Sequence, residues 1–415
     1  MRQVFQACLL LACLRYGEAI LKEVDFQMEN HFVFFLEMDY GLDVGATITV
    51  DLVNRKPAND TYVMILSHGQ WLAWRETELV TLKSDPEQPE SRSPLNAYLV
   101  SCWRGLLTDK LQGTFQVEEQ TGGRNRYTVI LVSALKSPVE VKGSLSLVNP
   151  GGQELSLQDR DVPKALMCLG ILFIVSTLAL LPLVVRKGAL QALLVVVLAL
   201  RGVVLMLRWL DLRLVAATGT EPGLVSISWA LLAKVQNILE LMMFLLISLG
   251  WKVLRNQLDV SEIRFAVAIS IISFYLGIFQ VACTTPSTCS GYQLSRYILH
   301  SLCYLVVIVA MNFNLQKLVS AIADAPASQE SGKLYKKLYA YHLFRWVFLM
   351  FIIAPTVELF LKVTIIPWDA QWLFLVLKEM RGWVIYVLLI HAYRPDQAPL
   401  RVFELTDRDA SSDRD

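Results

Sequence analysis

Charged residues are scarce in this 415-residue chain: they make up 18% of the sequence, whereas hydrophobic residues make up 54%. The mean hydropathy of +0.46 is too high for an ordinary soluble protein. The formal net charge is only +1, so the sequence lacks the basic excess that is typical of nucleic-acid binding. These shortages predict a membrane protein with no nucleic-acid partner.

Recognisable catalytic motifs are also missing from the sequence. The five histidines are scattered, and no HExxH zinc motif occurs. The stretch SGKLYKK, residues 331–337, lacks the upstream glycine of a phosphate-binding loop, and there is no G-x-S-x-G nucleophile motif. We therefore expect no catalytic residues, no metal site and no cofactor, and we interpret the chain as a protein that is not an enzyme.

The first 19 residues have the layout of a secretory signal peptide. A basic residue, Arg2, precedes an apolar core over residues 4–14, and residues 17–19 offer a plausible cleavage site. We predict that residues 1–19 are a signal peptide that brings the chain into the secretory route. The alternative is a short buried helix.

Residues 20–160 show the alternation of apolar and polar residues that is typical of strands. The segments are short and rich in Val, Ile, Thr and aromatic residues, and turn formers such as NRKPAND separate them. Seven strands at this spacing predict a β-sandwich, which we expect to fold independently of the rest of the chain. The predicted strands lie within HFVFFLEMDY (31–40), GATITVDLV (45–53), TYVMILSH (61–68), NAYLVSCW (96–103), TFQVEEQ (114–120), RYTVILVSAL (126–135) and VEVKGSLSLV (139–148).

Long apolar runs dominate the chain over residues 164–392. Each run is long enough to cross a hydrocarbon core of roughly 30 Å as a helix. The fold class predicted is therefore a membrane protein: an N-terminal all-β sandwich, a seven-helix transmembrane bundle and a polar tail over residues 393–415. The seven helices are expected over residues 165–185, 189–210, 224–250, 263–282, 294–314, 339–363 and 370–391.

Basic residues are distributed unequally between the two sides of this bundle. With residues 20–160 in the lumen, the cytoplasmic connectors and the tail carry thirteen Lys and Arg residues. The luminal connectors carry four, which are Arg208, Arg213, Arg296 and Lys362. This bias agrees with the positive-inside rule and with a signal peptide, so we predict a luminal N-terminus and a cytoplasmic C-terminus.

Two further features fit this topology. Cys283 and Cys289, in CTTPSTC, lie in a predicted luminal connector, where a disulfide is geometrically easy and the compartment permits it. We predict this disulfide; two free thiols are the alternative. Asn59 begins the one N-glycosylation sequon of the chain, in a predicted polar turn of the luminal domain.

Charged residues inside the apolar runs predict a polar cavity. Arg201 lies near the middle of the second run, where lipid exposure costs at least about 2.5 kcal/mol. We expect it to pair with Glu240 on the third run or with Glu358 on the sixth. The other polar residues expected to face the same inward, partly hydrated cavity are Lys234, Gln236 and Asn237 on the third run, and Lys378, Glu379 and Arg381 on the seventh. The alternative is a set of interhelical ion pairs that only fix packing.

The whole layout resembles the GOLD-domain seven-transmembrane family, also described as lung seven-transmembrane receptor-like proteins. LSLVNPGGQELS (145–156) is similar to the Asn-Pro-Gly exit from the luminal domain, and HAYRPDQ (391–397) is similar to the aromatic-Arg-Pro end of the last helix. Tyr393 stands where Trp is more usual, and luminal cysteines are sparse. The resemblance implies residence in the Golgi and neighbouring secretory membranes, a role in trafficking and kinship with the Wnt carrier Wntless.

The leading functional hypothesis is therefore a non-enzymatic Golgi protein that sorts or escorts luminal cargo. Its expected partners are membrane lipid, a luminal protein cargo and a cytoplasmic adaptor or coat protein that binds the tail. A receptor of the G-protein-coupled type is an alternative, although the third run ends LGWKVLRNQ without an Asp-Arg-Tyr-like triplet. A cation channel or transporter is a further alternative, against which stand the mixed charge signs and the lack of a glycine-rich filter segment.

Overall fold

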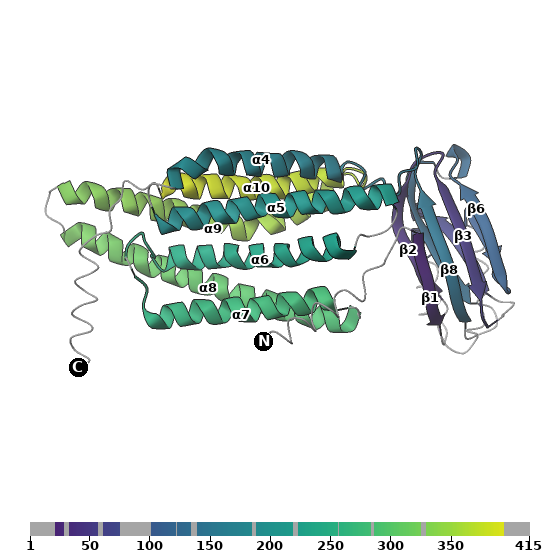
Figure 1. Ribbon diagram of the computed structural model, residues 1–415, viewed down its shortest axis with the longest axis horizontal. Helices are drawn as coiled ribbons and strands as arrows, with labels where there is room; N and C mark the ends of the chain where they lie inside the picture. Colours follow the sequence, from purple (N-terminus) through teal and green to yellow (C-terminus); the bar gives the residue numbers. More distant parts are fainter. Residues whose placement is uncertain are drawn as a thin grey trace.

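The computed structural model describes residues 21–28, 33–56, 61–74, 101–121, 123–133, 139–184, 188–218, 223–255, 257–283, 286–324 and 329–393. The predictions made for residues 1–19, for Asn59 and for the tail beyond Tyr393 lie outside these residues. An antiparallel β-sandwich and a bundle of seven helices lie end to end (Figure 1).

Two four-stranded antiparallel sheets form the sandwich. One has the order β1-β8-β3-β6 and the other has the order β2-β7-β4-β5. The strands are β1 (Leu21–Met28), β2 (Val33–Leu42), β3 (Thr47–Asn54), β4 (Thr61–Ser67), β5 (Trp103–Leu106), β6 (Lys110–Gln116), β7 (Asn125–Ser133) and β8 (Val139–Val148). The predicted sandwich is confirmed.

The core of the sandwich follows from alternation along the strands. In β3, Ile48, Val50 and Leu52 point inward and are almost fully buried, whereas Thr49 is exposed. The strands β4 and β7 are buried on both faces, because Trp71 and Trp74 cover the outer side of their sheet. This explains why β7 is a nearly continuous apolar run instead of an alternating one.

The sandwich has one strand that sequence patterning missed. The strand β1, LKEVDFQM, pairs with β8 along its whole length, but its sequence is too polar to stand out as a strand. The strand β5 begins at Trp103, the last residue of the segment NAYLVSCW, and β6 begins four residues before TFQVEEQ. The boundary predicted for β6 was wrong because strand ends are set by pairing partners as well as by local sequence. Residues 96–100 lie outside the described residues, so a strand there stays a prediction.

Each of the seven predicted runs corresponds to one helix. The helices are α4 (Val162–Val184), α5 (Ala189–Thr218), α6 (Gly223–Ser248), α7 (Val260–Ala282), α8 (Pro286–Asp324), α9 (Gln329–Thr364) and α10 (Gln371–Ala392). Among the described residues, six are long and apolar enough to cross a membrane by length and composition. The seventh, α10, has 22 residues and carries Lys378, Glu379 and Arg381 near its middle.

Two helices are much longer than predicted. The 39 residues of α8 and the 36 residues of α9 correspond to about 58 Å and 54 Å at 1.5 Å per residue. Both exceed the roughly 30 Å of a hydrocarbon core, and they extend past the other helices at the end opposite the sandwich (Figure 1). The apolar runs predicted only their membrane-spanning parts.

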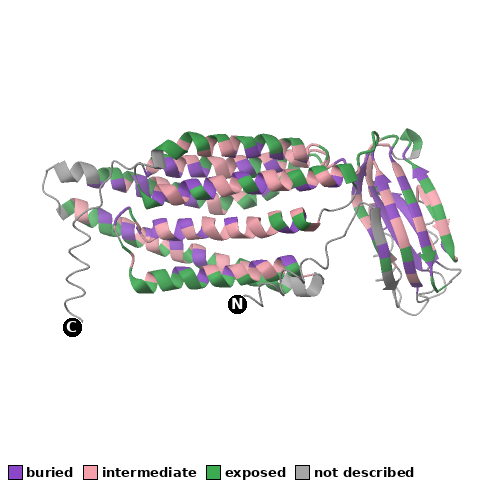
Figure 2. Cartoon of the chain, viewed as in Figure 1, coloured by how far each residue is buried: buried purple, intermediate pink, exposed green. Residues whose placement is uncertain are grey.

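Many residues on the outer faces of the helices are exposed (Figure 2), and large apolar side chains are common among them. Leu178 of α4, Val309 of α8 and Phe360 of α9 each expose about 60% of their surface. The interior contains a separate core that includes Phe244, Tyr341 and other large side chains. A helix bundle that is apolar on both sides is what a lipid environment requires.

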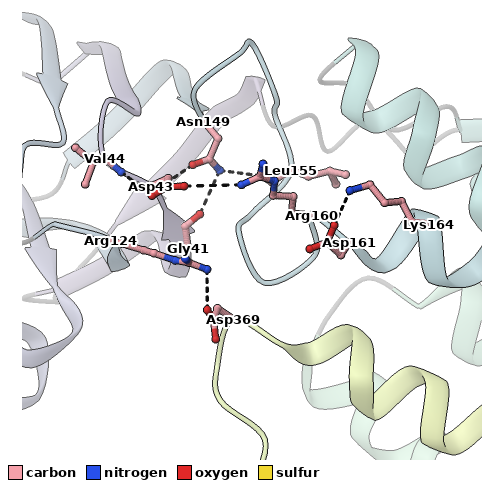
Figure 3. Close-up of polar contacts among 10 residues, drawn as sticks. All are labelled: Gly41, Asp43, Val44, Arg124, Asn149, Leu155, Arg160, Asp161, Lys164 and Asp369. Atoms are coloured by element: carbon pink, nitrogen blue, oxygen red, sulfur yellow. Dashed lines mark hydrogen bonds and ion pairs between the residues drawn. The ribbon is translucent and has the colours of Figure 1, made fainter.

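The chain leaves the sandwich through a turn that is fastened to β2. The side chain of Asn149 accepts a hydrogen bond from the backbone of Asp43 at 2.9 Å and donates one to the carbonyl of Leu155 at 2.8 Å (Figure 3). Gly151 and Gly152 both have positive φ, which other residues rarely adopt. The sequence NPGG therefore forms a fixed exit into α4.

A second connection comes from the loop between α9 and α10, over residues 365–370. Arg124 of the sandwich donates a hydrogen bond to Asp369 at 2.7 Å (Figure 3), and Arg126 lies over the ring of Trp368. Trp368 approaches Gly41 so closely that a Cβ there would lie 3.0 Å from the ring. We call this contact the joint: Gly41, Arg124, Arg126, Trp368 and Asp369. The sandwich has a hydrophobic core of its own, and its surface contacts the bundle at the joint. Its independent folding stays a prediction.

The joint continues into the first turn of α10. Gln371 donates a hydrogen bond to Gln158 at 2.8 Å, and Gln158 donates one to the carbonyl of Asp39 at 2.7 Å. Burial raises the pKa of the nearby Asp159 carboxyl, while the charges of Arg208 and Lys362 act in the opposite direction. The start of α10 is thus held against the sandwich by side chains.

Candidate functional site

A buried ion pair joins α5 to α10. The guanidinium of Arg201 donates two hydrogen bonds to the carboxylate of Glu379, at 2.7 Å and 2.5 Å. The side chain of Glu379 is only 3% exposed and that of Arg201 is 17% exposed. Because both oxygens of the carboxylate are used, the pair has the two-pronged geometry that makes Arg–carboxylate contacts strong.

Hydrogen bonds extend this pair to α6. Arg201 also donates to the side-chain oxygen of Gln236 at 2.7 Å, and the amide of Gln236 donates to the hydroxyl of Tyr386 at 3.2 Å. That hydroxyl donates to Glu240 at 2.9 Å. We call these five residues the buried network. It ties α5, α6 and α10 together, and each of its members has a polar partner, as buried polar groups require.

The partner predicted for Arg201 was wrong. Glu379 pairs with Arg201, whereas Glu240 is reached only through Tyr386. Glu358 pairs instead with Arg381, at 3.2 Å. The position of a residue along its helix gives its depth in the membrane, and several carboxylates lie at a depth close to that of Arg201. Which of them becomes its partner depends on which helices are neighbours, and α10 packs beside α5. Depth alone does not show this.

A cavity of about 520 Å³ lies between α5, α6, α8, α9 and α10. Its size is that of a small-molecule pocket. Of the nine residues predicted from sequence, six line it, which are Arg201, Asn237, Glu240, Lys378, Glu379 and Arg381.

The other three predicted residues do not line the cavity. The ammonium of Lys234 donates to Gln280 of α7 at 2.9 Å, and Gln236 lies behind the wall in the buried network. Glu358 is nearly buried beside Arg381. The expectation that the third-run residues share one side of α6 was therefore wrong for Lys234, which faces the neighbouring helix α7.

Two basic residues of the cavity were missed. Arg208 and Arg296 were assigned to luminal connectors, but both lie inside helices and line the cavity. Arg208 lies seven residues after Arg201, two turns along the same helix face, and this spacing could have identified it. Arg296 was counted with the luminal connector because it stands only two residues after the predicted start at residue 294, whereas α8 begins at Pro286 and places it well inside the helix.

Aromatic side chains form an apolar floor of the cavity. Phe244 lies 4.8 Å from Phe351 and 5.4 Å from Phe348 between ring centroids, and Tyr304 lies 5.8 Å from Phe351. These rings belong to α6, α8 and α9. The cavity therefore combines a charged wall with an apolar floor, which suits a ligand that has both characters. Within the described residues, no cluster of His, Cys, Asp and Glu could hold a metal ion.

The cysteines agree in part with the sequence. Cys283, which directly follows α7, is disulfide-bonded. The side chain of Cys289 lies outside the described residues, so its pairing with Cys283 stays a prediction. In the sandwich, the thiol of Cys102 donates to Gln70 at 2.9 Å, and burial raises its pKa.

Comparison with known proteins places the helical part of the chain. A family model described as "GOST, seven transmembrane domain" matches residues 164–400, which is more than half of the chain and spans all seven helices. The comparison with curated proteins found no match. The seven-transmembrane family expected from the NPGG and aromatic-Arg-Pro stretches is thereby confirmed.

Proposed function

Because the chain belongs to the GOST seven-transmembrane family, we propose that it is a non-enzymatic membrane protein of the Golgi and neighbouring secretory compartments that escorts luminal protein cargo. The sandwich contacts the cargo in the lumen, and the bundle responds to a ligand in its charged cavity. The resemblance of the whole layout to trafficking proteins supports the location and the role.

The single observation that carries the proposal is the position of α10. Its first turn is held by the joint through Asp369 and Gln371, and two turns later the same helix supplies Glu379 to the buried network. The separation between Gln371 and Glu379 is only about 12 Å along the helix. If α10 moves as a rigid element, a displacement at the sandwich is expected to reach the cavity, and the rescue experiment below tests this coupling.

The geometry favours an escort or sensor over a conducting pore. The rings of Phe244 and Phe351 line the cavity, and Phe348 packs against both of them. Charges of both signs line the cavity, and Arg201 is neutralised by Glu379. These features give the cation-channel alternative no support.

The test of the proposal is a rescue experiment. The gene is deleted in the native cell type, and the Golgi-to-surface transit of secreted glycoproteins is measured before and after the wild-type chain is restored. Arg124→Asp breaks the ion pair of the joint, and the double change Arg124→Asp with Asp369→Arg restores it with reversed charges. We expect wild type and the double variant to rescue transit, and Arg124→Asp to reach the same membranes without rescuing it.

The sandwich offers a matched control for this experiment. Arg55 pairs with Glu140 at 3.2 Å, and these side chains are as exposed as Arg124 and Asp369 are. Arg55→Asp should rescue transit fully, because its pair lies away from the bundle. Normal secretion after deletion of the gene would contradict the trafficking role, and equal failure of Arg55→Asp and Arg124→Asp would contradict a role of the joint.

The proposed topology has its own test. Protease added to sealed secretory vesicles should spare the sandwich and remove only residues that follow α10. Digestion of the sandwich in intact vesicles would contradict its luminal placement.

A further inference from the structure

Cationic side chains from four helices gather around the cavity. Arg208 of α5, Arg296 of α8 and Lys378 of α10 line the cavity, and Lys234 of α6 lies beside it. Within the described residues, none of these four has a carboxylate at ion-pair distance, although Arg201 and Arg381 both do. The cavity therefore carries an excess of positive charge.

The contacts that these cations do make carry no compensating charge. Lys234 and Arg296 both donate to the same side-chain oxygen of Gln280, at 2.9 Å and 2.8 Å. Arg208 lies 5.4 Å from the ring centroid of Trp229. An amide and an aromatic ring orient cations, but neither supplies the negative charge that would offset them.

Carboxylates offset only part of this positive charge. Glu379 is held by Arg201, and Glu358 by Arg381. Glu240 and Asp211 accept hydrogen bonds from the neutral groups of Tyr386 and Trp229 and so keep their negative charges, and Asp159 and Asp211 both act on the charge of Arg208. Five cationic side chains and two carboxylates line the cavity, so positive charge remains for a ligand to offset.

An unpaired charge within a membrane-spanning bundle is costly, and such charges are paired with one another or serve a ligand path. We propose that the cavity binds an anionic group, a carboxylate or a phosphate, between Arg208, Arg296 and Lys378. This deepens the proposed function, on which it rests, by naming the class of ligand to which the bundle responds.

The shape of the cavity adds a second property to this ligand. About 520 Å³ is far more space than the anionic group needs, and the remaining wall includes Val204, Leu205 and Leu241 above the floor of Phe244 and Phe351. Burial of apolar surface against such a wall stabilises binding. The ligand is therefore an amphiphile whose charged end faces the cationic side chains and whose apolar end faces the aromatic floor.

The test uses the full chain in nanodiscs of phosphatidylcholine. Octyl phosphate and octyl glucoside share a tail and differ in charge, so thermal stabilisation by each is compared on the wild-type protein. We expect octyl phosphate to stabilise the chain in a salt-dependent way and octyl glucoside to have little effect. This comparison needs no variant and so does not depend on whether a variant folds.

Variants then locate the site. Lys378→Gln and Arg296→Gln should each weaken binding of octyl phosphate by about tenfold, the equivalent of one hydrogen bond to a charged group. Lys317→Gln is the matched control, since the ammonium of Lys317 lies over the ring of Phe313 near the C-terminal end of α8 and does not line the cavity. Its affinity should equal that of wild type.

Native mass spectrometry separates the two sources of such an anion. Retention of phosphatidylserine from mixed nanodiscs, with displacement by octyl phosphate, identifies a lipid headgroup. Binding of octyl phosphate with no lipid retained identifies a soluble anion, and both results support an anionic ligand. Equal retention of phosphatidylcholine, or equal stabilisation by octyl glucoside, would overturn the inference.

Failure here is distinguishable from failure of the proposed function. If the cavity binds no anion while the chain still rescues secretion, the inference is wrong and the escort role stands. If octyl phosphate binds but deletion of the gene leaves secretion normal, the site stands and the escort role is wrong.

Discussion

The sandwich buries apolar residues and exposes charged ones, whereas the bundle exposes apolar residues and buries charged ones. In the sandwich, Leu52 is fully buried and Arg55 exposes about half of its side chain. In the bundle, Leu178 is 62% exposed and the side chain of Glu379 is 3% exposed. One chain therefore follows two opposite rules of burial.

The difference shows that the surrounding medium decides where each side chain lies. In water, apolar surface is hidden and charges are hydrated at the surface. In lipid, the outer surface of a helix gains nothing by being polar, so charges turn inward and must find partners there. The buried network is the bundle's counterpart of the surface ion pairs in the sandwich.

The largest effect that separates the two regions is expected at Arg201. Arg201→Leu or Glu379→Leu alone leaves a buried charge without its partner, which destabilises a protein by about 3–5 kcal/mol. The double variant removes both charges and should recover part of the loss. Folded yield and thermal unfolding of the detergent-solubilised chain measure all three.

The alternative pairing gives the control for this prediction. Arg201→Leu combined with Glu358→Leu should show no recovery, because Glu358 pairs with Arg381. Recovery in that double variant and none with Glu379→Leu would reject the pair described above.

The same substitution should behave differently in the two regions. Leu52→Ala opens a cavity in the sandwich core and should cost about 2–5 kcal/mol of unfolding free energy. Leu178→Ala faces the lipid side of α4, where no packed cavity forms, and should change stability by less than about 0.5 kcal/mol. Hydrogen exchange of each region in the full chain reports the two effects, and equal losses would refute the comparison.

Alkaline pH should weaken the sandwich through Tyr127. Burial raises the pKa of this tyrosine to about 12 from its ordinary value of 10.0, so the folded state keeps a proton that the unfolded state loses. Stability is therefore complete below pH 10 and falls as pH rises from about 10 to 12, by about 2–3 kcal/mol at most.

Tyr127→Phe tests this sign directly. The variant loses the hydrogen bond from the hydroxyl to the carbonyl of Gly123, so it should be weaker at neutral pH. Its difference from wild type should shrink as pH rises above 10. A difference that stays constant from pH 8 to pH 11 would show that Tyr127 does not contribute this dependence.

The smallest effect on stability is expected at the joint. The pair of Arg124 and Asp369 is half exposed, and such surface pairs contribute about 0–1 kcal/mol. Arg124→Ala should therefore barely change thermal unfolding, even though Arg124→Asp is expected to abolish rescue of secretion. A loss of several kcal/mol would mean that the joint holds the fold together as well as connecting its two parts.

The sequence predicted both parts of the fold for a simple physical reason. Strand alternation and long apolar runs are local patterns, and each is set by the medium that the segment faces. Residues 139–148 and α7 could therefore be placed almost to the residue. The strand β1 escaped because its polar sequence becomes a strand only through pairing with β8.

The sequence identified most residues of the candidate site, but only part of their arrangement in space. The cost of a charge in lipid showed that Arg201 faces inward, and Glu379 was recognised as part of the same polar set. The missed Arg208 follows Arg201 on the same helix face, a signal that was present in the sequence. Lys234 is different, because the spacing of residues on α6 does not show that Gln280 of α7 lies within its reach.

By itself, then, the sequence determined the two domains, the seven helices and the inward placement of Arg201, because each depends on one segment and its solvent. Only the tertiary structure decided that Glu379 is the partner of Arg201, that Trp368 seats on Gly41, and that Arg208, Arg296 and Lys378 meet around one cavity. Those facts depend on which helices are neighbours and how they are rotated. Packing between segments that are far apart in the chain sets both, and no local pattern records it.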